Sequence, residues 1–206
     1  MRTQAAAQNP RPNSKVVVIG CSVGGFMALT GILSAILPDF ALPVLVVQHL
    51  HPDDNGSFAR HLAGTAGLPV IEACDKEQIQ PGHIYTAPAN YHMLLEQDGT
   101  IALTLDEKVN WSRPSIDVLF ESAACALGPR LIAVVLSGAN TDGAAGVCAI
   151  KAAGGLVLAQ DPATAEFSAM PQAAIDTGAV DEVLPLREIG QRLAELGADE
   201  QVEKHG

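Results

Sequence analysis

The sequence predicts an α/β protein with a doubly wound, mainly parallel sheet, helices on both faces and an antiparallel hairpin addition. Short, continuous apolar runs alternate along the chain with segments of helical periodicity. Such strand–loop–helix repetition is typical of parallel sheets with right-handed crossovers. Asp98-Gly99 indicates the exception, because Asp-Gly between two short strand-like runs is a strong signal for a tight hairpin turn.

The expected elements follow from the length of each apolar run and from the residues that end it. Strands of the parallel sheet are expected at 15–20, 43–48, 70–71, 131–136, 156–160 and 180–184, and strands of the antiparallel addition at 83–86, 92–96 and 100–104. Helices are expected at 26–37, 57–62, 114–127, 144–153 and 171–177. Polar segments at 1–14 and 195–206 are expected to be tails, so residues 15–194 form a single domain.

Composition agrees with this fold and excludes some classes of function. The 206 residues are 48% hydrophobic but only 4% aromatic, which suits buried strands covered by small-residue helices. With a net charge of −11, the chain lacks the basic surface that a general nucleic-acid binder needs. No apolar run approaches the roughly 20 residues that span a bilayer, and the N-terminus lacks a signal-type apolar segment. We therefore expect a cytoplasmic protein without membrane insertion, in which the cysteines are small buried hydrophobes: Cys21, Cys74, Cys125 and Cys148.

Ser22 is the first candidate for chemistry. It follows the first expected strand in the stretch GCSVGG, which matches the G-x-S-x-G pattern of a nucleophile elbow. The helix that follows directs free N–H groups at the serine, and these favour an oxyanion. The competing interpretation is a phosphate-binding loop with Ser22 as a helix cap, but the chain has neither G-x-G-x-x-G nor G-K-[ST] there. A nucleophilic Cys21 is a minor alternative.

His49 follows the second expected strand and is the candidate base, because imidazole titrates near neutrality. His51 is its rival, and a surface-loop histidine is the plainer interpretation. The stretch HLHPDD also partly matches the H-x-H-x-D-H pattern of dinuclear metallohydrolases, with Asp54 in place of the last histidine. A metal-dependent hydrolase that uses His49 and His51 would need further ligands, for which the loose candidates are His83, His92 and Asp142.

Asp142 follows the strand expected at 131–136 and is the candidate carboxylate. It would accept a hydrogen bond from the His49 ring and so fix the tautomer; a simple helix cap is the competing role, and Asp161 is a rival. The carboxyl ends of parallel strands meet at one edge of a sheet, where ligands bind. We therefore expect Ser22 Oγ within about 3.5 Å of the nearer His49 nitrogen.

Other polar residues near these segments receive simpler interpretations. Trp111 and Arg113 precede the helix expected at 114–127, where they line a cleft or hold a loop. Asp117 is expected on a helix surface. His83 and His92, in the hairpin region, are expected to be structural.

Several long motifs together resemble the catalytic domain of the CheB family, the protein-glutamate methylesterases of bacterial chemotaxis. They are IGCSVGG, VVQHL, PGHIYTAPANYHM, RPSIDVLF, LSGANTDGAAG and AMPQAAIDTG, and the likeness extends from about Val16 to about Val183. It implies a catalytic triad of Ser22, His49 and Asp142 and no cofactor. The implied reaction is hydrolysis of glutamate γ-methyl esters on a methylated chemoreceptor, with release of methanol; some members also deamidate receptor glutamines. The implied oxyanion and substrate-binding set, beyond the triad, is Val23, Gly24, Ala139, Asn140 and Met170.

Three departures from the family pattern bear on this expectation. Val23 stands where members commonly have threonine, and Gly138-Ala139-Asn140 stands where they commonly have G-M-G. The family usually carries an N-terminal receiver domain, and none is expected within this chain, which is either a stand-alone enzyme or part of a longer protein. A catalytically weakened module that binds a receptor or scaffold is therefore the main alternative to the methylesterase.

Overall fold

The computed structural model describes residues 14–36 and 40–203, and seven of its strands form one parallel sheet in the order β3-β4-β2-β1-β7-β8-β9. The strands are β1 (Val16–Cys21), β2 (Val44–Gln48), β3 (Val70–Glu72), β4 (Ile84–Thr86), β7 (Leu131–Val135), β8 (Leu156–Gln160) and β9 (Glu182–Leu184). The chain first builds outward from β1 through β2 and later continues on the other side of β1 with β7. Between β1 and β7 the winding reverses, which is where sheets of this kind bind ligands.

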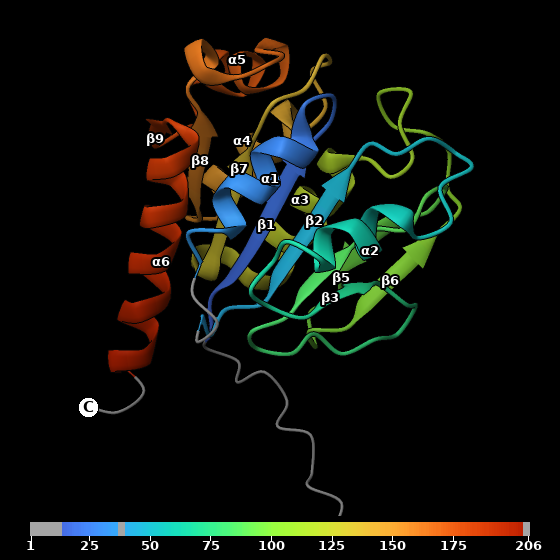
Figure 1. Cartoon of the computed structure of the whole chain (residues 1–206), viewed down its shortest axis with the longest axis horizontal. Coiled ribbons are helices and arrows are strands. Elements are labelled where there is room, and N and C mark those ends of the chain that lie inside the picture. Colours follow the sequence, from blue (N-terminus) through green and yellow to red (C-terminus); the bar gives the residue numbers. More distant parts are fainter. Residues whose placement is uncertain (1–13, 37–39, 204–206) are drawn as a thin grey trace, which may run out of the picture.

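Helices cover both faces of the sheet, as Figure 1 shows. The helices are α1 (Gly25–Leu33), α2 (Ser57–Ala63), α3 (Ile116–Leu127), α4 (Ala144–Ala152), α5 (Ala169–Asp176) and α6 (Leu186–Glu203). Alternate residues of β1 point to opposite faces, so Val17 and Ile19 pack with α1, whereas Val16 and Val18 pack with α3. Two hydrophobic cores result, one on each face, and the predicted doubly wound fold is confirmed.

The predicted hairpin is present but forms a sheet of its own. Strands β5 (His92–Leu95) and β6 (Ile101–Thr104) pair antiparallel around Asp98-Gly99, with Gly99 at φ 81°. Asp98 Oδ1 accepts hydrogen bonds from the N–H and hydroxyl of Thr100. The expectation that 83–86 belongs to this antiparallel part was wrong, because β4 pairs parallel with both β2 and β3.

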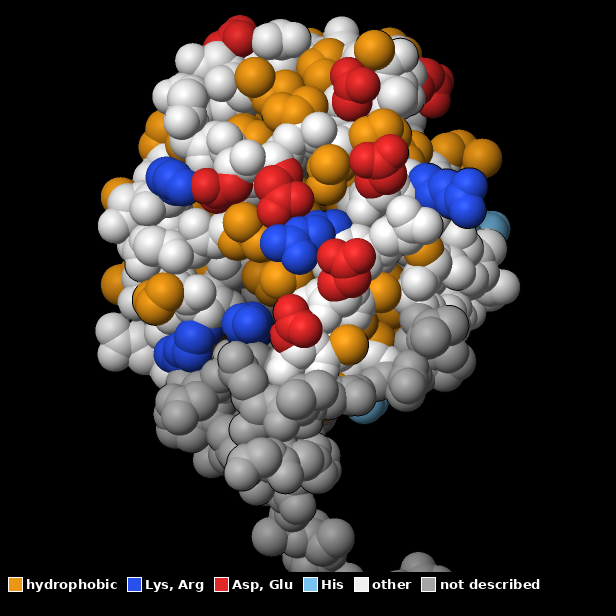
Figure 2. Space-filling view, turned by 90° about the vertical axis from the view of Figure 1, so that its left-hand side faces the viewer, with side chains coloured by type: hydrophobic (Ala, Val, Ile, Leu, Met, Phe, Trp, Pro, Cys, Tyr) orange, Lys and Arg blue, Asp and Glu red, His pale blue; other side chains and the backbone are white. Residues whose placement is uncertain are grey.

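The C-terminal segment differs most from the prediction, because the tail expected at 195–206 is helical as far as Glu203 in α6. Ile189, Leu193 and Leu196 form an apolar stripe at helical spacing and pack in the same core as α1. The outer side of this region carries interspersed acidic and basic side chains, as Figure 2 shows. Residues 204–206 and the tail expected at 1–13 lie outside the described residues, as do residues 37–39 at the end of the helix expected at 26–37.

The composition led us to expect no membrane-spanning helix and buried cysteines. Within 14–36 and 40–203, no helix is both long and apolar enough to cross a membrane. The cysteines are free, but only Cys21 is buried; the expectation of burial was wrong for Cys74, Cys125 and Cys148, which are exposed.

Candidate active site

Ser22 lies just beyond β1, in the turn that leads into α1. Its N–H donates to Ser137 O at 3.0 Å, and its carbonyl accepts from Gly25 N at 2.8 Å, so the ends of β1 and β7 and the start of α1 all fix its backbone. Gly24 completes the turn at φ 79°, where a Cβ would lie 2.7 Å from Ser137 Oγ. Only glycine fits this position, as an elbow of this type requires.

His49 and Asp142 meet at the same edge of the sheet. His49 Nε2 lies 2.8 Å from Asp142 Oδ2, so the hydrogen bond expected between them is present. The His49 side chain is 12% exposed and that of Asp142 is fully buried. The His49 backbone is held by a hydrogen bond from its N–H to Cys21 O, next to Ser22. Residues that follow β1, β2 and β7 thus come together, although they are far apart in sequence.

Asn140 fixes the tautomer of His49. Asp142 N donates to Asn140 Oδ1 at 3.2 Å, so the amide nitrogen of Asn140 faces the other way, and Nδ2 lies 3.3 Å from His49 Nδ1. Because an amide nitrogen can only donate, Nδ1 is the acceptor and Nε2 carries the proton that Asp142 accepts. Ser22 Oγ has no hydrogen-bond partner in the described part of the chain, so the expected Ser22–His49 hydrogen bond is not formed.

The Asp142 carboxylate is bound at the N-terminus of α3. Oδ2 accepts from Ile116 N at 2.7 Å, and Oδ1 accepts from Ser115 Oγ at 2.9 Å and from Asp117 N at 3.2 Å. Asn110 Nδ2 adds a further hydrogen bond to Oδ1 at 3.0 Å. Free N–H groups and the positive end of the helix dipole favour an anion here.

These contacts set the ionisation of Asp142. Burial by itself would raise its pKa, but hydrogen bonds from His49, Asn110 and Ile116 outweigh it and lower the pKa to about 2. The carboxylate is therefore ionised at neutral pH. A buried, ionised carboxylate bonded to a histidine can stabilise an imidazolium during reaction.

Asp117 is buried, so the expectation that it lies on a helix surface was wrong. Its Oδ1 accepts from Gly146 N at 2.7 Å, in the first turn of α4, and its Oδ2 accepts from Asn110 Nδ2 at 2.7 Å. Burial raises its pKa, and the nearby charge of Asp142 adds to this effect. Asn110 therefore donates to both carboxylates, and the sequence analysis identified neither its role nor that of Asp117.

Gln48 is a second residue that the sequence analysis missed. It is the last residue of β2, and its Nε2 donates to Ser22 O at 2.8 Å and to His49 O at 3.0 Å. Gln160, the last residue of β8, accepts from Ser137 N at 2.9 Å in a similar way. A polar residue that ends an otherwise apolar buried strand was the available signal, because such a group is buried only where it finds partners.

The rival residues have other surroundings. Cys21 is fully buried and its Sγ faces Gln48 Oε1; burial strongly raises the pKa of its thiol, which disfavours a nucleophilic thiolate. His51 points into solvent, with its side chain 78% exposed, and Asp54 caps the start of α2 through Gly56 N and Ser57 Oγ. Asp161 accepts a hydrogen bond from Ala163 N within its own turn. Across the described ranges, no three His, Cys, Asp or Glu side chains gather as metal ligands would.

The remaining expected site residues divide into two groups. The N–H groups of Val23 and Ala139 have no acceptor among the described residues, so they are available to a ligand. Met170 is only 1% exposed and packs against Gly138, where an added Cβ would meet its Sδ at 2.7 Å. Met170 therefore supports the loop before Asp142 from inside, and its expected contact with substrate stays a prediction.

Comparison with known proteins shows the family to which the chain belongs. A family model described as CheB methylesterase matches residues 17–193. A curated relative from Leptospira interrogans is 44% identical over 184 residues, which make up 89% of this chain and 95% of that protein. A Bordetella parapertussis relative, named protein-glutamate methylesterase/protein-glutamine glutaminase, is 43% identical over 88% of this chain but only 53% of its own length. The crystal structure of the Thermotoga maritima CheB methylesterase catalytic domain matches with a TM-score of 0.85 and 38% identity, covering 89% of this chain and 98% of that one.

Proposed function

Because this chain belongs to the CheB methylesterase family, we propose that it hydrolyses glutamate γ-methyl esters on a chemoreceptor through Ser22, His49 and Asp142. The observation that carries the proposal is the 2.8 Å contact between His49 Nε2 and the buried carboxylate of Asp142, beside a serine whose hydroxyl has no hydrogen-bond partner within 14–36 and 40–203. A histidine oriented in this way by a carboxylate is the part of a triad that a coincidental cluster lacks.

The orientation of His49 assigns a role to each nitrogen. Nε2 carries a proton that it donates in a hydrogen bond to Asp142, so Nδ1 is the nitrogen that takes the proton of Ser22. When substrate enters, the Asn140 amide moves away from His49 Nδ1. A rotation of the Ser22 side chain then brings Oγ within hydrogen-bond distance of that nitrogen. Ser22 Oγ then attacks the ester carbonyl, and the oxyanion is held by the N–H groups of Val23 and Ala139. Asn140 Nδ2, once released, lies in the same loop as Ala139 and can donate to the same oxygen.

In the remaining steps, His49 passes on the proton that it took from Ser22. The tetrahedral intermediate collapses to an acyl-enzyme ester on Ser22, and the imidazolium of His49 returns its proton to the leaving methoxide, which departs as methanol. Water then attacks the acyl group with His49 as base again, giving the glutamate carboxylate and free Ser22. A receptor glutamine would enter by the same route, with ammonia as the leaving group.

The proposal is tested by measuring methanol release from methylated receptor with wild type and Ser22→Ala side by side. We expect Ser22→Ala to lose release entirely while its unfolding transition stays cooperative. Ser34→Ala is the matched control, because Ser34 is an exposed serine at the end of α1 whose hydroxyl donates to Gly31 O, and it should keep wild-type turnover. Methanol release that survives in Ser22→Ala, or that a chelator abolishes in wild type, would overturn the serine mechanism.

The second candidate function is a weakened module that only binds its receptor. The absence of a Ser22–His49 hydrogen bond among the described residues favours it, as do Val23 and Ala139 in place of the common threonine and methionine. Binding of methylated receptor without any methanol release by wild type would support this candidate against the methylesterase.

A further inference from the structure

Trp111 occupies an unusual position at the tip of a tight turn. Val109 and Ser112 exchange backbone hydrogen bonds of 3.2 and 2.8 Å, and the two residues between them, Asn110 and Trp111, have φ of 49° and 64°. Two consecutive positive φ values are typical of a type I′ turn. Trp111 is 95% exposed, the highest value among the exposed large hydrophobic residues.

This arrangement costs free energy in two ways. Asparagine tolerates a left-handed backbone, but a bulky residue such as tryptophan adopts it rarely and under strain. The indole also gains nothing from burial, although aromatic side chains supply large contact areas when they are covered. Residues held in strained backbone conformations cluster at active sites and ligand-binding sites.

The turn is anchored directly on the candidate active site. Asn110, the neighbour of Trp111, donates its amide to Asp142 Oδ1 and Asp117 Oδ2. Arg113 Nη1 closes the base of the loop by donating to the carbonyls of Leu105 and Asp106. The indole is therefore presented on a rigid support whose position is set by the carboxylate that holds His49.

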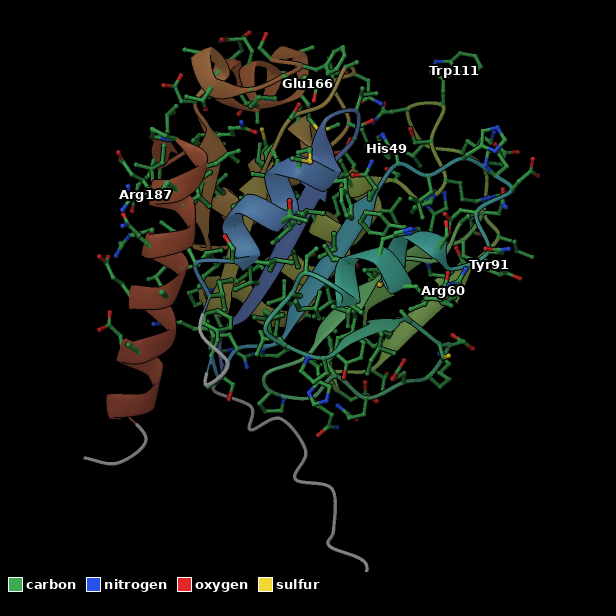
Figure 3. The ribbon with its side chains drawn as sticks, viewed as in Figure 1. His49, Arg60, Tyr91, Trp111, Glu166 and Arg187 are labelled. Carbon is green, nitrogen blue, oxygen red and sulfur yellow. The ribbon has the colours of Figure 1, made fainter. Side chains whose placement is uncertain are left out.

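Other exposed apolar side chains lie around the same edge of the sheet. Val23, next to Ser22, is 50% exposed, and Phe167, whose carbonyl accepts from Gly138 N, is 38% exposed. In Figure 3, Trp111 and Glu166 stand on either side of His49 at the same end of the molecule, and Trp111 points outward. Exposed apolar side chains thus lie at the same edge of the sheet as Ser22, where a protein surface could cover them.

We propose that Trp111 is a docking residue that inserts between apolar side chains of the substrate protein, beside the glutamate ester that enters the Ser22 site. This inference rests on the proposed function and adds that the enzyme recognises a folded protein surface and not the ester alone. Tryptophan is enriched among residues that dominate binding free energy at interfaces. Trp111 makes no contact with the triad atoms, so its contribution is to binding of the large substrate.

The chain has one tryptophan, so its fluorescence reports Trp111 directly. In Ser22→Ala, which binds without turnover, we expect methylated receptor to shift the emission to shorter wavelength as the indole leaves water. In the otherwise wild-type chain, Trp111→Ala should raise KM for methylated receptor about tenfold or more, with kcat nearly unchanged. Wild type and Trp111→Ala should hydrolyse a small glutamate γ-methyl ester peptide equally well.

Three further variants control for folding and for exposure. Trp111→Gly relieves the backbone strain, so it should unfold at a higher urea concentration than wild type and yet show the same rise in KM. Trp111→Phe should recover part of the affinity. Tyr91→Ala, which removes another exposed aromatic away from this turn, should leave KM unchanged.

The outcomes separate this inference from the proposed function. Methanol release from receptor by wild type, combined with unmoved emission and an unchanged KM in Trp111→Ala, would overturn docking and leave the methylesterase standing. A shift in emission without methanol release by wild type would keep the docking role and overturn the methylesterase.

Discussion

Asp117 and Asp142 form a reciprocal pair: Asp142 binds the N-terminus of α3, which contains Asp117, and Asp117 binds the N-terminus of α4, which follows Asp142. Asp142 lies two residues before the start of α4 and accepts from Ile116 N in α3, whereas Asp117 lies in α3 and accepts from Gly146 N in α4. The two helices pack closely against each other behind the sheet (Figure 1). The position of the candidate catalytic carboxylate is therefore set by the same contacts that join α3 to α4.

Asn110→Ala tests whether the amide of Asn110 offsets the electrostatic repulsion between the carboxylates of Asp117 and Asp142. The amide of Asn110 donates to both, and its loss leaves two buried carboxylates without their shared donor. We expect a loss of about 2–3 kcal/mol in the free energy of unfolding at pH 7. The pKa of Asp117 is already raised by burial and by Asp142, so Asp117 takes up a proton as the pH falls, and the deficit should shrink toward pH 4.

Urea unfolding at both pH values measures this change, and Asn90→Ala is the matched control. Asn90 also has a positive φ, of 67°, but its amide bonds a single neutral carbonyl, that of Pro52. Its replacement should cost about 1 kcal/mol at either pH. A deficit in Asn110→Ala that is equally large at pH 7 and pH 4 would contradict the proposed repulsion.

Asp142→Asn should remove an acid-sensitive part of the stability. The pKa of Asp142 is about 2 in the folded protein and ordinarily 3.8, so the ionised group stabilises the fold above pH 4. This contribution, on the order of 2 kcal/mol, is lost as the pH falls from about 4 to about 2. Wild type should therefore exceed Asp142→Asn in stability at pH 5, and the gap should narrow toward pH 2. Asp106→Asn, at an exposed loop position, should show no comparable difference in stability between the two pH values.

Gln48→Leu should impair catalysis without blocking the site. Leucine fills a similar volume, but the carbonyls of Ser22 and His49 lose their buried donor. We expect a destabilisation of about 1–3 kcal/mol. Because both backbones gain freedom, kcat should fall at least about tenfold for the small ester and for methylated receptor alike. Steady-state kinetics with both substrates checks this, and wild-type kcat in a destabilised variant would show that Gln48 serves the fold alone.

Gly24→Ala and Gly178→Ala separate backbone strain from close approach. Both glycines have similar positive φ, 79° and 74°, but a Cβ at Gly178 meets nothing within 4 Å, whereas one at Gly24 meets Ser137 Oγ at 2.7 Å and Glu166 Oε2 at 2.9 Å. Gly178→Ala should cost about 1 kcal/mol and leave turnover intact. Gly24→Ala should cost at least about 2 kcal/mol and lower kcat, because the turn at Ser22 must shift. Equal losses of stability in the two variants would contradict the crowding at Gly24.

Much of the fold was predictable because buried parallel strands read as uninterrupted apolar runs. The position of β4 was not, since a three-residue strand does not encode which neighbour it will pair with. Helix α6 was missed because its outer face and its end are acidic and polar, which concealed the stripe of Ile189, Leu193 and Leu196.

The candidate site was predictable where side chains follow strands. Ser22 and His49 come directly after β1 and β2, Asp142 lies in the loop that follows β7, and the order of strands brings these three segments together. Asn110 lies in a loop without a recognisable motif, so only the folded structure reveals its amide between Asp117 and Asp142. Which His49 nitrogen faces Asp142 depends on the rotamer, and this too is absent from the sequence.

The binding of Asp142 to α3 has a consequence for the newly made chain. Ile116 and Ser115 can hold the carboxylate only after α3 has docked, and residues 115–142 must all be synthesised before this happens. A nascent or partly unfolded polypeptide therefore presents the serine with no oriented base. If Ser22 acts as we propose, ester hydrolysis begins only after α3 has docked.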